Sequence, residues 1–158
     1  MGNAKESEIV QGLNMGIRQR AIWFHLLLEA AEAQGCDIEK LTDDAIFPYG
    51  VGVSAGETGD EPLDMLHHFC GAGPFFEIFD KEIITEEPDK CVALFHRCPL
   101  VDAWRAYGLS PERIDRLCQL ANKGDYGRAS NFANASLDFP TRIGGGDDCC
   151  TLMITRKP

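Results

Sequence analysis

The sequence predicts an α+β fold in which N-terminal helices pack on an antiparallel sheet of two hairpins, with short helices in between. Apolar residues recur at helical spacing over residues 7–34, and two pairs of short apolar segments separated by turns follow residue 74. The chain of 158 residues has the length of one domain. We expect a single domain over 1–158, with a helical part at about 7–71 and a sheet-containing part at about 74–157.

The composition argues against several classes of partner. A net charge of −10 disfavours nucleic acid, because phosphate backbones bind through Lys and Arg. No segment approaches the ~20 apolar residues of a membrane span, and the N-terminus lacks the apolar core of a signal peptide. We therefore expect a cytoplasmic protein with no membrane partner, whose seven cysteines are reduced.

The helical part begins with a long helix from Ser7, a suitable N-cap, to about Gln34. Its apolar face is wide enough to serve a homo-oligomer as well as a core. A second helix is expected over 36–48, since proline at position 48 resists continuation, and a glycine-rich loop should follow it. A third helix is expected from Glu61 to Cys70.

The first hairpin is predicted from two strands, 75–85 and 90–97, joined by an acidic turn. Strand alternation places Val92 and Leu94 on one face together with His96 and Cys98. An apolar face that ends in a histidine and a cysteine is a natural wall for a pocket.

Two helices are expected between the hairpins. Pro99 suits the first turn of a helix, so Cys98 stands at a helix N-terminus, where the dipole favours a thiolate. Ser110 and Pro111 mark the start of the next helix, on which Cys118 belongs to the apolar face. The polar, glycine-spaced residues after it, 122–135, are predicted to form a loop with a short helix.

The second hairpin is predicted from strands at 137–143 and 149–155, joined by a turn with three glycines and two aspartates. Alternation directs Cys150 to the core and Cys149 to the other face. The backbone N–H groups of the turn could bind a carboxylate, and a plain flexible turn is the alternative. Arg142 is the cation nearest to this turn in the sequence.

Two chemistries fit the cysteines that are expected to face inward. A thiolate could act as a nucleophile, with a histidine as base and an aspartate that orients it. Alternatively, several thiolates and an imidazole could hold zinc, which would activate water or serve structure only. The chain contains no Cys-x-x-Cys pair, so the spacing does not decide between them.

Three segments resemble the L-2-amino-thiazoline-4-carboxylic acid hydrolase family: HRCPLVDAWRAYGL at 96–109, LC at 117–118 and IGGGDDCCTLMI at 143–154. The resemblance implies hydrolytic opening of a C–N bond in a small cyclic amidine-like substrate such as 2-aminothiazoline-4-carboxylate. The matched positions are Cys98, Cys118, Gly146, Asp147, Asp148 and Cys150. The ending of the chain is also similar to 4-vinyl reductase domains, which implies a non-enzymatic module that binds a small molecule.

These expectations define a candidate site for a small-molecule substrate. The expected catalytic residues are Cys98, His96, Asp148, Cys150 and Cys118. The expected substrate-binding residues are Gly145, Gly146, Asp147 and Arg142. Zinc, if it is bound, would be held by Cys98, Cys118, Cys150 and His96. His96 could protonate the leaving nitrogen. The alternative is a binding module for a small molecule or metal that uses the same cysteine cluster without turnover.

Overall fold

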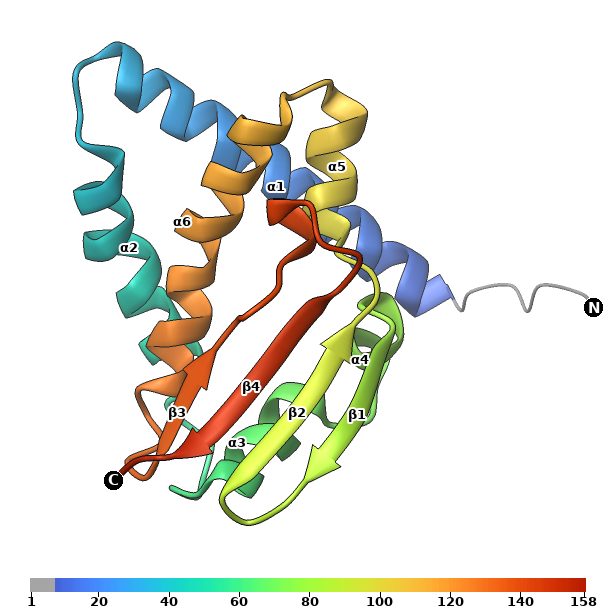
Figure 1. Cartoon of the computed structure of the whole chain (residues 1–158). Coiled ribbons are helices and arrows are strands. Elements are labelled where there is room, and N and C mark those ends of the chain that lie inside the picture. The colour runs from blue at the N-terminus through green and yellow to red at the C-terminus, as the bar shows by residue number, and fades with distance from the viewer. Residues whose placement is uncertain (1–7) are drawn as a thin grey trace, which may run out of the picture.

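The computed structural model describes residues 8–158 and confirms the α+β class (Figure 1). Its helices are α1 (Glu8–Ala33), α2 (Ile38–Val53), α3 (Pro62–Cys70), α4 (Pro74–Ile78), α5 (Pro99–Tyr107) and α6 (Pro111–Ala129), with a short 3₁₀ helix η1 (Ile143–Gly145). The strands are β1 (Lys81–Glu86), β2 (Lys90–Phe95), β3 (Ala135–Asp138) and β4 (Cys150–Arg156). The expected N-cap Ser7 lies outside the described residues.

The four strands form one antiparallel sheet in the order β1-β2-β4-β3. Phe95 at the end of β2 pairs with Lys81 on one side and with Cys150 on the other. These three residues therefore make one row across the sheet, at the end nearest α5. Figure 1 shows α3 behind the sheet and α1 crossing behind α5 and α6 beyond the upper end of the strands, and among the described residues no helix covers the face turned to the viewer.

Two apolar clusters hold the helices in place. One joins α3 to the sheet through Leu66, Ala93 and Leu152, all fully buried. The other joins α1, α5 and α6 around Trp104, whose indole Nε1 donates a hydrogen bond of 2.8 Å to the carbonyl of Ala21. The row of Lys81, Phe95 and Cys150 lies where the sheet meets both clusters.

The helices α2 and α6 are longer than the sequence predicts. Helix α2 runs through Pro48 to Val53, and α6 continues through the predicted loop to Ala129. Glycines explain both differences: a side chain at Gly50 would collide with the backbone of α6 at Gly124, so the two helices pack backbone to backbone. These glycines permit a close helix crossing instead of breaking the helices.

Both hairpins also differ from expectation. Residues 75–78, predicted as the start of a strand, belong to α4, because Pro74 occupies the first helical position after Gly73 at a positive φ of 143°. In the second hairpin, β3 is only four residues long and a long connection with the 3₁₀ helix η1 replaces the predicted tight turn. The expected helix at 61–70 and the Ser110 cap are confirmed.

Helix α1 exposes large apolar side chains, including Trp23 at 73% and Leu27 at 68% of their full accessibility. They are one helical turn apart, so they share a face. The homo-oligomer expected through this helix stays a prediction. Within residues 8–158, none of the helices combines the length and apolar character that a membrane crossing needs.

Candidate functional site

A cavity of about 830 Å³ lies between the sheet end and the helices α1, α5 and α6. Its walls are rich in aromatic rings, namely Phe24, Tyr49, Phe69, Phe75, Phe79, Phe95, Trp104 and Phe139. The thiols of Cys98, Cys118 and Cys150 also line it, so three segments that are distant in the sequence bring the predicted cysteines to one place. This cavity is the candidate site.

Cys98 reaches the cavity because the chain leaves the sheet before it. Strand β2 ends at Phe95, and Arg97 then donates its backbone N–H to the carbonyl of Phe79 at 3.2 Å. Cys98 follows as the N-cap of α5. Burial raises the pKa of its thiol to about 12, and the amides of Leu100 and Val101 at the start of α5 act in the opposite direction.

The pocket-facing strand face differs from the predicted one. Cys91 and Ala93 are fully buried, whereas Val92 and Leu94 on the predicted face are only partly buried. The cavity is therefore walled by the face that contains Phe95. Strand alternation would have put Cys98 on the face opposite Phe95. Cys98 lines the cavity together with Phe95 because β2 ends before it.

Cys118 and Cys150 meet through the segment that contains η1. Gly144 packs directly on Cys118, with no room for a side chain. One residue earlier, Ile143 donates its backbone N–H to the Sγ of Cys150 at 3.3 Å. Burial raises the pKa of both thiols, that of Cys150 to about 11, and the guanidinium of Arg142 opposes the rise at Cys118. Burial therefore disfavours the thiolate form of both residues.

His96 does not line the cavity. Its Nε2 lies 2.9 Å from Oε2 of Glu82 on the edge strand β1, and both side chains are exposed. The residue stands just beyond the end of β2, where the backbone N–H of His96 bonds to the carbonyl of Asp80 at 3.1 Å. The structure thus separates His96 from the three thiols with which the sequence analysis groups it.

The glycine turn also lies outside the cavity lining. The backbone N–H groups of Gly145 and Asp147 both bond to the carbonyl of Arg142, and that of Gly146 bonds to Ile143. The turn therefore uses these donors itself, and they do not form an open anion site. Asp147 accepts the backbone N–H of Arg142 at 2.8 Å, which closes the turn.

The two other polar residues of the predicted site lie apart from the cavity as well. Asp148 is exposed. The guanidinium of Arg142 pairs with Asp115 at 2.8 Å and interacts with the Cys118 thiol, and Arg142 is not part of the cavity lining. Arg142 therefore affects the pKa of the Cys118 thiol and does not contact the interior of the cavity.

Asp125 is a cavity residue that sequence reasoning missed. It lies in the segment predicted as a loop, and only the continued α6 places it two turns after Cys118 on the same face. Its carboxylate makes no hydrogen bond or ion pair with any residue in 8–158. Burial raises its pKa to about 6, against the attraction of Arg128, Lys81 and Arg20. The spacing of Cys118, Asn122 and Asp125 is the signal that could have found it.

Lys81 is the second missed residue. Its Nζ donates to the carbonyl of Phe69 at 2.6 Å and lies 4.7 Å from the ring centroid of Phe95. Burial lowers its pKa, and nearby Asp125 acts in the opposite direction. The neighbouring Arg128 is occupied by an ion pair with Glu57 and by a hydrogen bond of 2.7 Å to the carbonyl of His68.

The residues that the structure describes contain no group of three or more His, Cys, Asp or Glu side chains arranged to hold a metal ion. The expected zinc ligands are divided, since His96 pairs with Glu82 outside the cavity. Zinc binding stays a prediction, and no chemical step below depends on it.

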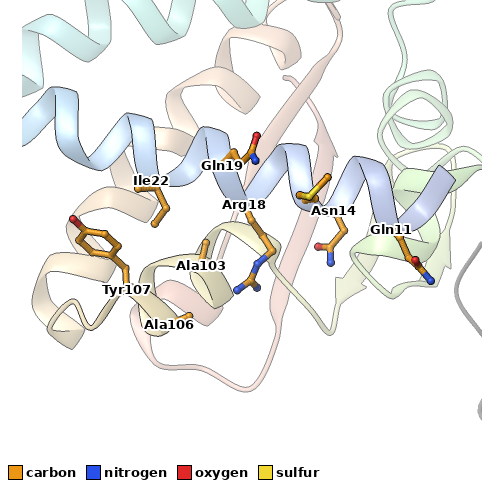
Figure 2. Close-up of a pocket in the computed structure, with 9 residues that line it drawn as sticks. Gln11, Asn14, Arg18, Gln19, Ile22, Ala103, Ala106 and Tyr107 are labelled. Atoms are coloured by element: carbon orange, nitrogen blue, oxygen red, sulfur yellow. The ribbon is translucent and has the colours of Figure 1, made fainter. Parts of the chain in front are cut away.

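A second hollow, of about 510 Å³, lies between α1 and α5 on the outer surface (Figure 2). Figure 2 shows Asn14 and Arg18 reaching from α1 toward α5, where Ala103 and Tyr107 form the other side. Its lining includes no cysteine, histidine or carboxylate. It contains none of the predicted site residues and supplies no nucleophile.

Comparisons with known proteins bear on the fold and the family. The family model described as L-2-amino-thiazoline-4-carboxylic acid hydrolase matches residues 15–154. No curated protein matches the chain. Among solved structures, the chain is similar to a trafficking protein particle complex subunit 3 from Naegleria fowleri that is covalently bound to palmitic acid. The two are 13% identical with a TM-score of 0.59, over 91% of this chain and 96% of the other, which shows a shared fold.

Proposed function

Because the chain belongs to the L-2-amino-thiazoline-4-carboxylic acid hydrolase family, we propose that its cavity hydrolyses a C–N bond in a small cyclic amidine such as 2-aminothiazoline-4-carboxylate. The observation that carries the proposal is the convergence of three thiols and one carboxylate in a single aromatic cavity. A nucleophile and a group for a polar ligand are thereby present in one place.

Cys98 is the proposed nucleophile. It is the only one of the three thiols at a helix N-terminus, where the amides of Leu100 and Val101 favour the thiolate. Burial keeps the thiol neutral until a ligand arrives. A cationic amidine within about 4–6 Å would favour the thiolate and lower the pKa of Cys98. Substrate binding would therefore activate the nucleophile.

The proposed reaction balances without any other reactant than water. The sulfur of Cys98 adds to the amidine carbon, and the ring C–N bond breaks with its electron pair going to nitrogen. The proton of the thiol reaches that nitrogen, which becomes an amine. Water then adds to the same carbon, the bond to Cys98 breaks, and the thiol is restored. The ring sulfur stays attached to the carbon, so the product has a free amine and no free thiol.

Incubation of the protein with 2-aminothiazoline-4-carboxylate tests this function. We expect ring opening, followed by nuclear magnetic resonance, that produces one amine and, once the protein is removed, no small-molecule thiol detectable with a thiol reagent. The protein without its cavity thiols provides the background rate. Release of a thiol would mean that the ring C–S bond breaks instead. Absence of any turnover would remove the hydrolase assignment.

A second candidate is a non-enzymatic module that carries an acyl chain on a cavity cysteine. The volume of about 830 Å³ and the aromatic walls favour it, and the structural relative is covalently bound to palmitic acid. Protein purified from cells would then show a long-chain acyl mass on a cavity cysteine that hydroxylamine removes. The charged side chains of Asp125 and Lys81 in the same cavity favour the hydrolase instead, because an alkyl chain has no group to pair with them.

A further inference from the structure

We propose that Lys81 and Asp125 are the specificity-determining residues of this cavity: Lys81 binds the substrate carboxylate, and Asp125 binds the amidine nitrogens. The inference rests on the proposed function of the cavity and assigns recognition to two residues outside the predicted site.

On the side of the cavity that the sheet forms, Lys81 and Cys150 lie two strands apart. Both are register partners of Phe95, one on β1 and the other on β4. Neighbouring strands are about 4.8 Å apart, so the backbones of these two residues are separated by about 10 Å. The ammonium of Lys81 lies 4.7 Å from the ring centroid of Phe95, the residue between the two, and Lys81, Phe95 and Cys150 all line the cavity.

On the side of the cavity that α6 forms, a cysteine and a charged residue are separated by a similar distance. Cys118 and Asp125 are seven residues apart on α6, which corresponds to about 10 Å along the axis and to nearly the same direction around it. Both residues line the cavity. Each wall therefore has a thiol at one end and a charged group at the other, and the two charges are opposite in sign.

The two opposite charges suit a short substrate that has a charge of each sign. A five-membered ring that bears both an amidine and a carboxylate is such a molecule, and the aromatic side chains of the cavity lining fit the faces of its ring.

The hydrogen-bonding state of the groups agrees with a ligand between them. Asp125 is partly buried, lines the cavity and has no hydrogen bond or ion pair within the described residues, so a ligand would not have to displace another partner from it. Lys81 uses one of its three N–H donors, on the carbonyl of Phe69. The two charges do not pair with each other, so each remains available to the opposite charge of a ligand that has both.

Binding of two inert probes tests this assignment without any need for turnover. The aromatic 2-aminothiazole-4-carboxylate has both groups, and 2-aminothiazole lacks the carboxylate. In calorimetric titrations of the wild-type protein we expect the carboxylate probe to bind on the order of 10-fold more tightly. Lys81→Met should abolish this difference and leave 2-aminothiazole unaffected. Asp125→Asn should weaken both probes by on the order of 10-fold.

Lys90→Met is the matched control, because Lys90 is exposed at the start of β2 and outside the cavity lining. Equal binding of the two probes to the wild-type protein would overturn the proposal, whether or not Lys81→Met folds. So would loss of both probes to the same degree in Lys81→Met when its melting temperature is unchanged. If the probes behave as expected while 2-aminothiazoline-4-carboxylate is never opened, recognition holds and the hydrolase proposal fails.

Discussion

Replacement of Cys98 by serine is expected to reduce turnover by at least ~10³-fold, the scale seen when a catalytic nucleophile is removed. A hydroxyl is far less acidic than a thiol, and in this apolar site the two amides of α5 cannot make it an alkoxide. The fold should be retained, because the change is small in volume. Steady-state kinetics with 2-aminothiazoline-4-carboxylate and thermal melting together measure the two effects.

Cys36→Ser is the control for this substitution. Cys36 is exposed in the connection between α1 and α2, so its replacement should change neither turnover nor melting temperature. Full activity of Cys98→Ser would remove this thiol from the mechanism. A lower melting temperature with unchanged activity would show that the Cys98 thiol contributes packing alone.

Asp125→Asn is expected to stabilise the ligand-free protein above pH 6. The pKa of Asp125 is about 6 in the folded chain and near 3.8 when unfolded, so the folded state holds the proton more tightly. Stability is consequently lost as the pH rises from about 4 to 6, and the loss is complete above that range. An asparagine side chain does not ionise, so Asp125→Asn avoids this loss. Its free energy of unfolding should exceed that of the wild-type protein by on the order of 2 kcal/mol at pH 7.5, and should not differ below about pH 4.

Urea denaturation of both proteins at pH 4 and pH 7.5 measures this gain. Asp148→Asn is the matched control, since Asp148 is exposed outside the cavity lining, and it should have little effect at either pH. A decrease in stability of Asp125→Asn at pH 7.5 would mean that the carboxylate has a stabilising partner in the ligand-free protein. The expected gain in stability with loss of probe affinity is typical of a functional group held at a cost to the fold.

Local signals in the sequence correctly predict much of the fold and the inward orientation of two of the three thiols, Cys118 and Cys150. The Ser110 cap and the apolar face of α6 correctly direct Cys118 inward, and alternation with Leu152 and Ile154 correctly directs Cys150 toward the core. The family resemblance is confirmed by the match over residues 15–154. These features depend on contacts within one element, which periodicity reports well.

The rest of the site depends on contacts between elements. The glycines at 124 and 127 have the pattern of a loop, and only the close approach of α2 shows that α6 continues past them to Asp125. Similarly, Lys81 has the pattern of an exposed strand residue until the Phe69 carbonyl and the Phe95 ring enclose it. A single sequence does not indicate which neighbours will pack against such residues.

His96 illustrates the opposite error. Strand alternation continued through residue 98 groups His96 with Cys98, whereas β2 ends at Phe95 and the chain turns toward α5. The histidine then pairs with Glu82 on β1 while the cysteine enters the cavity. Strand ends are where alternation loses its meaning, because the hydrogen-bonded ladder that enforces it has stopped.

The most direct test of a nucleophilic cavity thiol is a rapid-quench mass measurement of the wild-type protein in a single turnover of 2-aminothiazoline-4-carboxylate. We predict a transient mass gain equal to the whole substrate, located by peptide mapping at Cys98 and absent from the exposed Cys36. Complete conversion of the substrate with no mass gain on Cys98, Cys118 or Cys150 would contradict covalent catalysis in this cavity.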